Sequence, residues 1–251
     1  MSYDFSDRYF LITGAGRGLG AHLAEYLAGS GATVGVADID GENADSVAGE
    51  IVESGGKAMA LVGDIGNRKT FLKLADEFAN QGERIDAIVN NAMILKYGPV
   101  ETVEPELLNA MLGVGVEALF WSAQALLEHY DAGRGACLIN MASPVAVKGF
   151  PNTSVYSTVK GAVVAFTRTM AAELGPRNIR VNAVSPASVP TPGAMGLNTP
   201  EEYEKRAKNI PLRRNGTEAD NSKAIAFLLS DDASFVHGEI FNVDGGVAAC
   251  A

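Results

Sequence analysis

Short apolar runs alternate with helical patterns along most of the chain, and this alternation restricts the fold more than any other feature. Seven runs are typical of strands, at residues 9–13, 32–37, 58–62, 85–89, 136–141, 179–184 and 239–243. Helical patterns separate them, at residues 21–28, 40–53, 69–80, 106–130, 155–174 and 218–229. Repeated strand–helix units favour parallel strands, because each helix returns the chain to the same end of the sheet. We therefore predict an α/β fold: a doubly wound parallel sheet of about seven strands with helices on both faces.

The chain shows no repeat, linker or low-complexity segment. Its 251 residues, 47% of them hydrophobic, are enough for one core. We therefore expect a single domain over residues 1–251. The segment 188–212 interrupts the alternation, holds four prolines and includes a helical stretch at 200–208. Because it follows a strand end, we predict a lid over the substrate, with a plain surface loop as the alternative.

Charge and composition argue against several classes of protein. The net charge is −10 and no basic cluster is present, so we expect neither nucleic acid nor a membrane surface as a partner. No apolar run reaches the roughly 18 residues that cross a bilayer, and the N-terminus lacks a signal-peptide pattern. Cys137 and Cys250 form no disulfide framework, which favours free thiols and a cytoplasmic location. The three histidines lack metal-ligand spacing, so we expect no metal.

A glycine-rich turn joins the first predicted strand to the first helix. Glycine allows a tight turn and a close approach of backbone to ligand. The helix that follows offers free N–H groups and the positive end of its dipole, which suit a pyrophosphate. A glycine cluster alone is a weak motif, but one between a strand and a helix is more specific. We therefore expect a dinucleotide to contact Gly14, Arg17, Gly18, Leu19 and Gly20.

The second predicted strand ends at Asp38, 18 residues after Gly20. A carboxylate at this place hydrogen-bonds both ribose hydroxyls of an adenosine and repels a 2′-phosphate, so we favour NAD over NADP. Arg17 is the opposing feature, since a cation in the turn helps to bind a phosphate. We interpret it as a solvated arginine or a general pyrophosphate contact.

The helical pattern at 155–174 carries Tyr156 and Lys160, which share one helix face one turn apart. A cation beside a phenol lowers the tyrosine pKa from its usual value of about 10, so Tyr156 becomes a candidate acid/base. Ser143 follows a strand end, where its hydroxyl can hydrogen-bond the same substrate oxygen. The alternative is an ordinary tyrosine and lysine on an amphipathic helix. Residues at the predicted strand ends should line one crevice: Asp38, Asp64, Asn90, Ser143 and Pro186.

Taken together, these motifs resemble the classical short-chain dehydrogenase/reductase family over nearly the full chain. The matching residues are Thr13-Gly14-x-x-x-Gly18-x-Gly20, Asn90-Asn91-Ala92, Ser143 with Tyr156-x-x-x-Lys160, and Asp244-Gly245-Gly246. The resemblance implies a single Rossmann-like domain that uses a nicotinamide cofactor. It implies that Tyr156 is the acid/base, that Ser143 polarises the substrate oxygen, and that Lys160 lowers the pKa of Tyr156 and holds the nicotinamide ribose.

The same resemblance implies further contacts and an assembly. Asp64 and Ile65 would lie at the adenine, Asn90 and Ala92 along the ribose, and Val189 and Thr191 at the carboxamide. Members of the family are usually homotetramers or homodimers, joined through the two long helices, here 106–130 and 155–174.

Three residues depart from the family pattern. Gly115 occupies a slot where asparagine is usual, and Met93 and Ala187 occupy slots where glycine is usual. The glycine keeps its carbonyl but loses the side-chain bonds of the asparagine, which we expect to weaken the proton relay. With Gly113 also present, the helix should be locally loose, since each glycine costs about 1 kcal/mol relative to alanine.

We therefore predict an NAD-dependent oxidoreductase that interconverts a secondary alcohol and a ketone. Two alternatives stay open: a catalytically weakened nucleotide-binding or regulatory protein, and enoyl reduction or dehydration at the same site. Apolar residues near the site favour a small neutral alcohol or ketone, although Lys96 and Lys148 leave an anionic substrate open. The predicted substrate contacts are Ser143, Val145, Phe150, Tyr156 and Met195, in a pocket that also includes Met93, Leu95, Val147 and Leu197.

Overall fold

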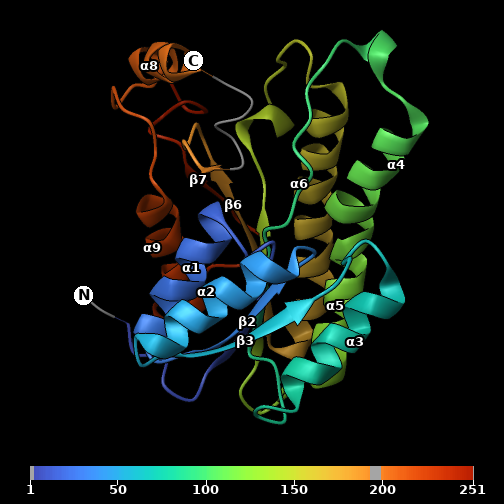
Figure 1. The fold of residues 1–251 in the computed structure, drawn as a ribbon, viewed down its shortest axis with the longest axis vertical. Coiled ribbons are helices and arrows are strands. Elements are labelled where there is room, and N and C mark those ends of the chain that lie inside the picture. Colours follow the sequence, from blue (N-terminus) through green and yellow to red (C-terminus); the bar gives the residue numbers. More distant parts are fainter. Residues whose placement is uncertain (1–2, 193–198, 251) are drawn as a thin grey trace.

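A computed structural model of the chain places its strands side by side in one parallel sheet (Figure 1). The structure describes residues 3–192 and 199–250. Within these residues the sheet has seven strands in the order β3-β2-β1-β4-β5-β6-β7. This confirms the predicted α/β, Rossmann-like doubly wound fold. The strands are β1 (Tyr9–Thr13), β2 (Thr33–Asp38), β3 (Lys57–Val62), β4 (Ala87–Asn90), β5 (Ala136–Met141), β6 (Ile179–Pro186) and β7 (Ile240–Val243).

Helices cover both faces of the sheet, and Figure 1 shows the two groups apart. On one face lie α1 (Gly18–Gly29), α2 (Gly41–Glu53) and α9 (Glu218–Leu229). On the other lie α3 (Arg68–Ala79), α5 (Ala118–His129) and α6 (Ser154–Leu174). Successive side chains of a strand point to opposite faces. In β1, Ile12 accordingly joins the first hydrophobic cluster and Leu11 the second.

The helix predicted over 106–130 is interrupted. The structure has α4 (Pro105–Leu112), a π-helical turn (Gly113–Glu117) and then α5. A π-helical turn is wider than an α-helical one and is rare in helices. A β-carbon at residue 115 would be crowded by Val159 and Met93, whereas one at residue 113 would meet only Gly66 Cα, at 4.0 Å. The expected local weakness therefore takes the form of a π-helical turn in which only Gly115 is closely packed.

This region is more apolar than the predicted absence of a membrane-crossing run implies. An 18-residue window within Pro105–His129 has a mean hydropathy of 1.4, so by length and composition alone this segment could cross a membrane. In the structure this segment belongs to the core of the sheet-and-helix fold, because α5 packs against α3, β4 and β5, and α4 packs against α6. This packing buries 44% of the window and explains that share of its apolar side chains.

The predicted lid contains α8 (Pro200–Asn209). A capping box fixes its first turn: the Glu202 N–H donates to Thr199 Oγ1 at 3.3 Å, and the Thr199 N–H donates to Glu202 Oε2 at 2.7 Å. Tyr203 and Ile210 are its buried anchors. The predicted contacts Met195 and Leu197 lie outside the described residues.

A chain of buried polar side chains crosses the core behind the carboxyl ends of β4 and β5. Asn90 Nδ2 donates to Asn140 Oδ1 at 2.8 Å and to Ser122 Oγ at 2.8 Å. Asn140 Nδ2 donates in turn to Thr167 Oγ1 at 2.9 Å. These hydrogen bonds join β4, β5, α5 and α6 in an environment where an unsatisfied amide is costly.

Asn140→Ala should therefore lower the free energy of unfolding by about 1–3 kcal/mol, because it leaves buried polar partners without their hydrogen bonds. The measurement is urea unfolding followed by circular dichroism. Asn80→Ala, at an exposed helix end, is the control and should change stability much less. Equal effects of the two variants would contradict a stabilising role for the buried chain.

Candidate functional site

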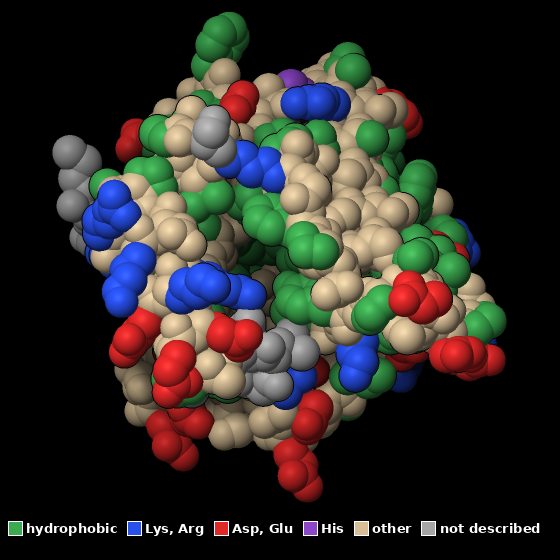
Figure 2. All heavy atoms as spheres, turned by 90° about the horizontal axis from the view of Figure 1, so that it is seen from above, with side chains coloured by type: hydrophobic (Ala, Val, Ile, Leu, Met, Phe, Trp, Pro, Cys, Tyr) green, Lys and Arg blue, Asp and Glu red, His purple; other side chains and the backbone are tan. Residues whose placement is uncertain are grey.

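A cavity of about 1500 Å³ opens at the carboxyl ends of the strands. Its walls come from the segments that follow β1, β2, β3, β4, β5 and β6, together with α8. Figure 2 shows the hollow with hydrophobic side chains around it and basic side chains at its rim. The carboxyl ends of parallel strands are where open α/β sheets bind ligands.

The glycine turn lies at one end of this cavity and is tightly packed. Gly14 has φ +62°, and a β-carbon there would lie 2.7 Å from Ala92 Cα. Asn91 Nδ2 holds the turn by donating to the carbonyl oxygens of Thr13 and Gly14, each at 2.9 Å. Helix α1 starts at Gly18, so its free N–H groups face the cavity edge that Gly18 lines. This cradle suits an anionic group.

Gly20 lies beneath the turn rather than in the cavity wall. A β-carbon at Gly20 would lie 2.3 Å from the Gly14 carbonyl oxygen. Residue 20 must therefore be glycine for α1 to pack against the turn. Thr191, on the opposite wall, closes over the turn, because a β-carbon at Gly18 would lie 3.2 Å from Thr191 Cβ.

Asp38 projects from the end of β2 into the same cavity. Its Oδ2 accepts a hydrogen bond from the Gly16 N–H at 2.9 Å, and its Oδ1 accepts one from the Asp40 N–H at 3.1 Å. These bonds hold the carboxylate in one orientation while each oxygen keeps further acceptor capacity. Arg17 lines the cavity too, but its side chain is exposed.

Ser143, Tyr156 and Lys160 come together at the end of β5 and the first turns of α6. The Ser143 side chain lies close enough to Tyr156 to lower the pKa of the phenol. Lys160 is 5% exposed, and its Nζ lies 5.6 Å from the centre of the Tyr156 ring. The ammonium donates to the Met141 carbonyl oxygen at 2.5 Å, so the end of β5 positions the lysine. Ser143 and Tyr156 line the cavity, and Lys160 lies behind them.

The pKa of Tyr156 is raised in the structure, whereas the sequence predicted a lowered one. Burial and then the neighbouring Tyr97 phenol raise the pKa of Tyr156, and the nearby Ser143 hydroxyl lowers it by less. Burial also lowers the pKa of Lys160 to about 8. Because both groups are removed from water, desolvation outweighs the stabilisation of the phenolate that we expected from Lys160. The ammonium of Lys160 is lost as the pH rises through this value.

Most of the predicted site residues line this one cavity: Gly14, Arg17, Gly18, Leu19, Asp38, Asp64, Ile65, Ala92, Ser143, Val145, Phe150, Tyr156, Val189 and Thr191. Gly20, Asn90 and Lys160 do not. The Asn90 amide points into the buried polar chain, whereas its neighbour Asn91 holds the glycine turn. Met195 lies outside the described residues.

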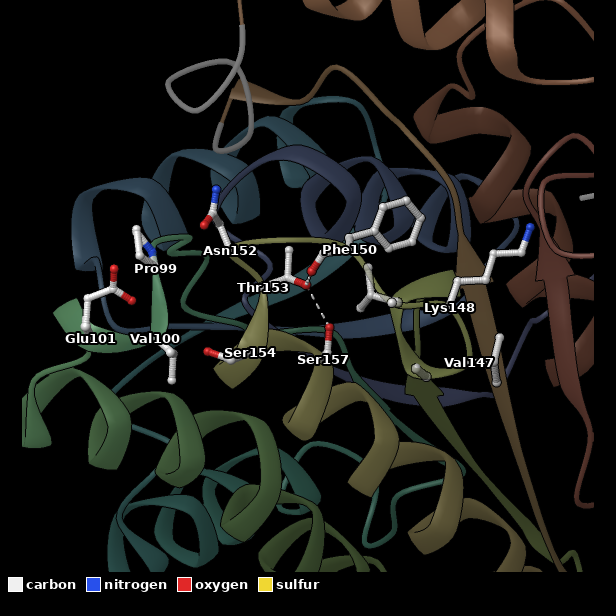
Figure 3. Close-up of a pocket in the computed structure, with 13 residues that line it drawn as sticks. Pro99, Val100, Glu101, Val147, Lys148, Phe150, Asn152, Thr153, Ser154 and Ser157 are labelled. Atoms are coloured by element: carbon white, nitrogen blue, oxygen red, sulfur yellow. Dashed lines mark hydrogen bonds between the residues drawn. The ribbon is translucent and has the colours of Figure 1, made fainter.

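Val147 does not reach the main cavity. It lines a smaller hollow of about 850 Å³ beside the start of α6, which Figure 3 shows with Val100, Lys148 and Phe150 around it. Thr153 and Ser157 are hydrogen-bonded there, with 2.9 Å between their hydroxyl oxygens. Val147 is 73% exposed, so it contributes little to an enclosed apolar pocket.

Met93 and Gly115, two of the departures from the family pattern, lie against each other. A β-carbon on Gly115 would lie 2.4 Å from Val159 Cγ1 and 3.0 Å from Met93 Sδ. The thioether and the branched side chain therefore occupy the space into which a side chain at residue 115 would project. The two departures together form one repacked contact between the segment after β4, the π-helical turn and α6.

Sequence reasoning missed Tyr97, Tyr203 and Arg206, which also line the cavity. Tyr97 packs edge-on against Tyr156, with ring centres 5.6 Å apart. Only their positions in the sequence could have indicated these residues. Tyr97 follows the end of β4, and Tyr203 and Arg206 lie in the helical stretch of the lid. Lys96 and Lys148, the cations considered from sequence, do not line the main cavity. Lys148 Nζ donates to the Val247 carbonyl oxygen.

One group of potential metal ligands lies away from the cavity. Asp76, Glu128 and His129 have ligand atoms within 4.8 Å of one another, at the contact of α3 with α5. His129 Nε2 lies 2.8 Å from Asp76 Oδ1. Both carboxylates are exposed, and the imidazole–carboxylate pair explains this arrangement as a surface contact between two helices.

Comparison with known proteins gives consistent results. The family whose sequence profile matches residues 14–248 is described as enoyl-(acyl carrier protein) reductase. The chain is 35% identical over 245 residues to cyclopentanol dehydrogenase of Comamonas testosteroni. The aligned region covers 97% of this chain and 98% of that protein.

Solved structures match over almost the whole chain. The 3-ketoacyl-(acyl-carrier-protein) reductase from Brucella melitensis, complexed with NADH, has a TM-score of 0.90 and 34% identity, covering 98% of this chain and 100% of that one. The short-chain dehydrogenase/reductase from Serratia marcescens has a TM-score of 0.92 and 28% identity, with coverage of 98% and 100%.

Gly115→Ala should destabilise the protein by about 1–3 kcal/mol, because the added methyl group overlaps Val159 and Met93. Adding Val159→Ala should recover part of this loss, so that the double variant is more stable than the sum of the single changes predicts. The measurement is urea unfolding of the four proteins of the cycle.

Gly49→Ala is the matched control, because Gly49 lies in α2 and an added β-carbon meets nothing within 4 Å. It should raise stability by up to about 1 kcal/mol through helix propensity. If Gly115→Ala behaved like this control, the repacked contact would be refuted.

Proposed function

This chain belongs to the classical short-chain dehydrogenase/reductase family of oxidoreductases, and on that premise we propose that it interconverts a secondary alcohol and a ketone with NAD(H). The observation that carries the proposal is the meeting of Ser143, Tyr156 and Lys160 at the cavity that also holds the glycine turn and Asp38. One cavity therefore brings together a candidate acid/base, a donor for the substrate oxygen and a candidate dinucleotide site.

The residues present fit a nicotinamide dinucleotide. The glycine turn leaves a cradle that side chains at Gly14 or Gly18 would narrow, and the N-terminus of α1 faces it. Asp38, oriented by two backbone N–H groups, suits a ribose with two free hydroxyls better than one with a phosphate. Asp64 and Ile65 would lie at the adenine, Ala92 along the ribose, and Val189 and Thr191 at the carboxamide.

The chain's own residues handle the proton. Tyr156 as phenolate takes the hydroxyl proton of the alcohol, while Ser143 donates a hydrogen bond to the same oxygen as it becomes a carbonyl. A preorganised donor of this kind contributes about 2–4 kcal/mol in comparable sites. Lys160 supplies positive charge behind the phenol and lowers the cost of the phenolate. When bound, the nicotinamide supplies the acceptor for the hydride that leaves the carbinol carbon.

The proposal extends to the setting of the reaction. Residues 1–251 act as one domain, with 188–212 as the substrate lid, and the protein works in the cytoplasm as a homotetramer or homodimer. The substrate is a small alcohol or ketone, since Met93, Leu95, Val145 and Phe150 give the cavity apolar walls. The relative in Comamonas testosteroni, named for cyclopentanol, supports this class.

Tyr156→Phe should lower kcat by about 10²–10⁴-fold while NAD still binds, because the ring stays and only the proton-carrying hydroxyl is lost. The assay is reduction of NAD, followed by absorbance, with a panel of neutral secondary alcohols, and calorimetry reports NAD binding. Tyr26→Phe, outside the cavity, is the control. Retained turnover in Tyr156→Phe would remove Tyr156 from the mechanism. Oxidation of NADH by enones but not by ketones would replace the proposed reaction with enoyl reduction.

Asp38→Ala should raise the KM for NAD by about 10–100-fold, because a charge-assisted hydrogen bond to the ribose is lost. The KM for NADP should rise less or fall, since the repulsion of the 2′-phosphate disappears. The ratio of kcat/KM for the two cofactors measures the change. A wild-type enzyme that prefers NADP, with a ratio unchanged by the substitution, would contradict the assignment of Asp38.

A further inference from the structure

Three side chains that the proposed chemistry does not use form the wall of the cavity next to Tyr156. Tyr97 follows β4, and Tyr203 and Arg206 come from α8. The ring of Tyr97 meets the ring of Tyr156 edge-on, with 5.6 Å between centres and an interplanar angle of 68°. Tyr97 therefore contacts the candidate acid/base directly.

Tyr203 is the central residue of this group. It is 7% exposed, and its hydroxyl oxygen is buried without a hydrogen-bond partner among the described residues. Its backbone is held in place, because Asn215 Nδ2 donates to the Tyr203 carbonyl oxygen at 3.1 Å. The residue also lines the cavity. A buried tyrosine hydroxyl usually finds a partner, since an unsatisfied polar group in the interior is unfavourable.

The three side chains lie near one another in the wall of the cavity. The pKa of Tyr97 is raised by burial, lowered by the charge of Arg206 and raised again by Tyr203. The guanidinium carbon of Arg206 lies 5.9 Å from the centre of the Tyr203 ring. This part of the wall therefore carries two phenols and a guanidinium, in contrast to the apolar walls formed by Met93 and Leu95.

We propose that Tyr203, assisted by Tyr97 and Arg206, binds a second oxygen of the substrate. This oxygen lies on the side of the substrate away from the reacting carbinol or carbonyl carbon. The inference rests on the proposed function and narrows its substrate. The preferred compound is an alcohol or ketone with a further acceptor oxygen, in a keto, hydroxyl or carboxylate group. A purely monofunctional cyclic alcohol leaves the Tyr203 hydroxyl unsatisfied and is bound less well.

The test compares matched pairs of ketones in the wild type and in Tyr203→Phe. The monoketones are cyclohexanone and decalone, and each is paired with the diketone, the hydroxyketone and the keto acid built on the same ring system. Wild type should favour at least one oxygenated partner in kcat/KM by about fivefold or more, the size of one buried hydrogen bond. Tyr203→Phe should reduce this ratio towards one. Tyr130→Phe, outside the cavity, is the matched control and should leave the ratio unchanged.

The nature of the second oxygen follows from which partner is preferred. Preference for the keto acid, lost at high salt, identifies a carboxylate at Arg206, because an exposed cation is screened by salt. Preference for the diketone or hydroxyketone that persists at high salt identifies a neutral oxygen at Tyr203. A ratio near one in wild type for all pairs, or a ratio that Tyr203→Phe leaves intact, overturns the inference.

Binding without turnover separates this inference from the proposed function. Saturation-transfer NMR on the protein with NAD present compares binding of the same pairs and needs no catalysis. Selective binding of an oxygenated partner that disappears in Tyr203→Phe, with no turnover of any pair, would support the second-oxygen site and refute the proposed reaction. Turnover of every pair without discrimination would support the reaction and refute the site.

Discussion

The hydrogen bonds between the ends of β1 and β4 are the constraint on which the rest of the site depends. The sheet runs outward from β1 through β2 to β3 in one direction and from β4 through β5 to β6 and β7 in the other. The crevice therefore opens between β1 and β4. Thr13 Oγ1 accepts from the N–H groups of Asn91 and Ala92, each at 3.1 Å, and the Asn91 amide returns two bonds to the glycine turn. The two halves of the cavity are held together at this point.

Much of this arrangement follows from the sequence for clear physical reasons. Parallel pairing brings strand ends to one edge, so residues that follow apolar runs, such as Asp38 and Ser143, must lie near each other. Helical spacing places Tyr156 over Lys160. What the sequence cannot supply is the direction of a side chain at a strand end. Asn90 and Asn91 are adjacent and chemically identical, yet Asn90, the last residue of β4, enters the buried polar chain, and Asn91, just past the strand, holds the turn.

The environment of the tyrosine is the second quantity that spacing does not reveal. A lysine four residues away predicts a lowered tyrosine pKa if both groups keep some contact with water. In the structure Lys160 is buried and bonded to the Met141 carbonyl oxygen, and Tyr156 is packed beneath Tyr97. Desolvation then acts against the charged form of both residues. Under the proposed function, acid/base work by Tyr156 relies on Ser143 and on what fills the cavity as well as on Lys160.

The repacked contact at Gly115 changes how the missing asparagine is understood. Taken alone, a glycine in that slot suggests a weakened site, since a side-chain amide is lost. The structure shows that the space is filled by Met93 and Val159, and that the π-helical turn packs against α6 there. Val159 precedes Lys160 in the helix, so this contact supports the turn of α6 that carries both Tyr156 and Lys160. Because close packing restricts side-chain motion, Met93 and Val159 support this part of α6 where the side-chain bonds of an asparagine are absent. The two departures are therefore better explained as one coordinated substitution than as two separate defects of a degenerating enzyme.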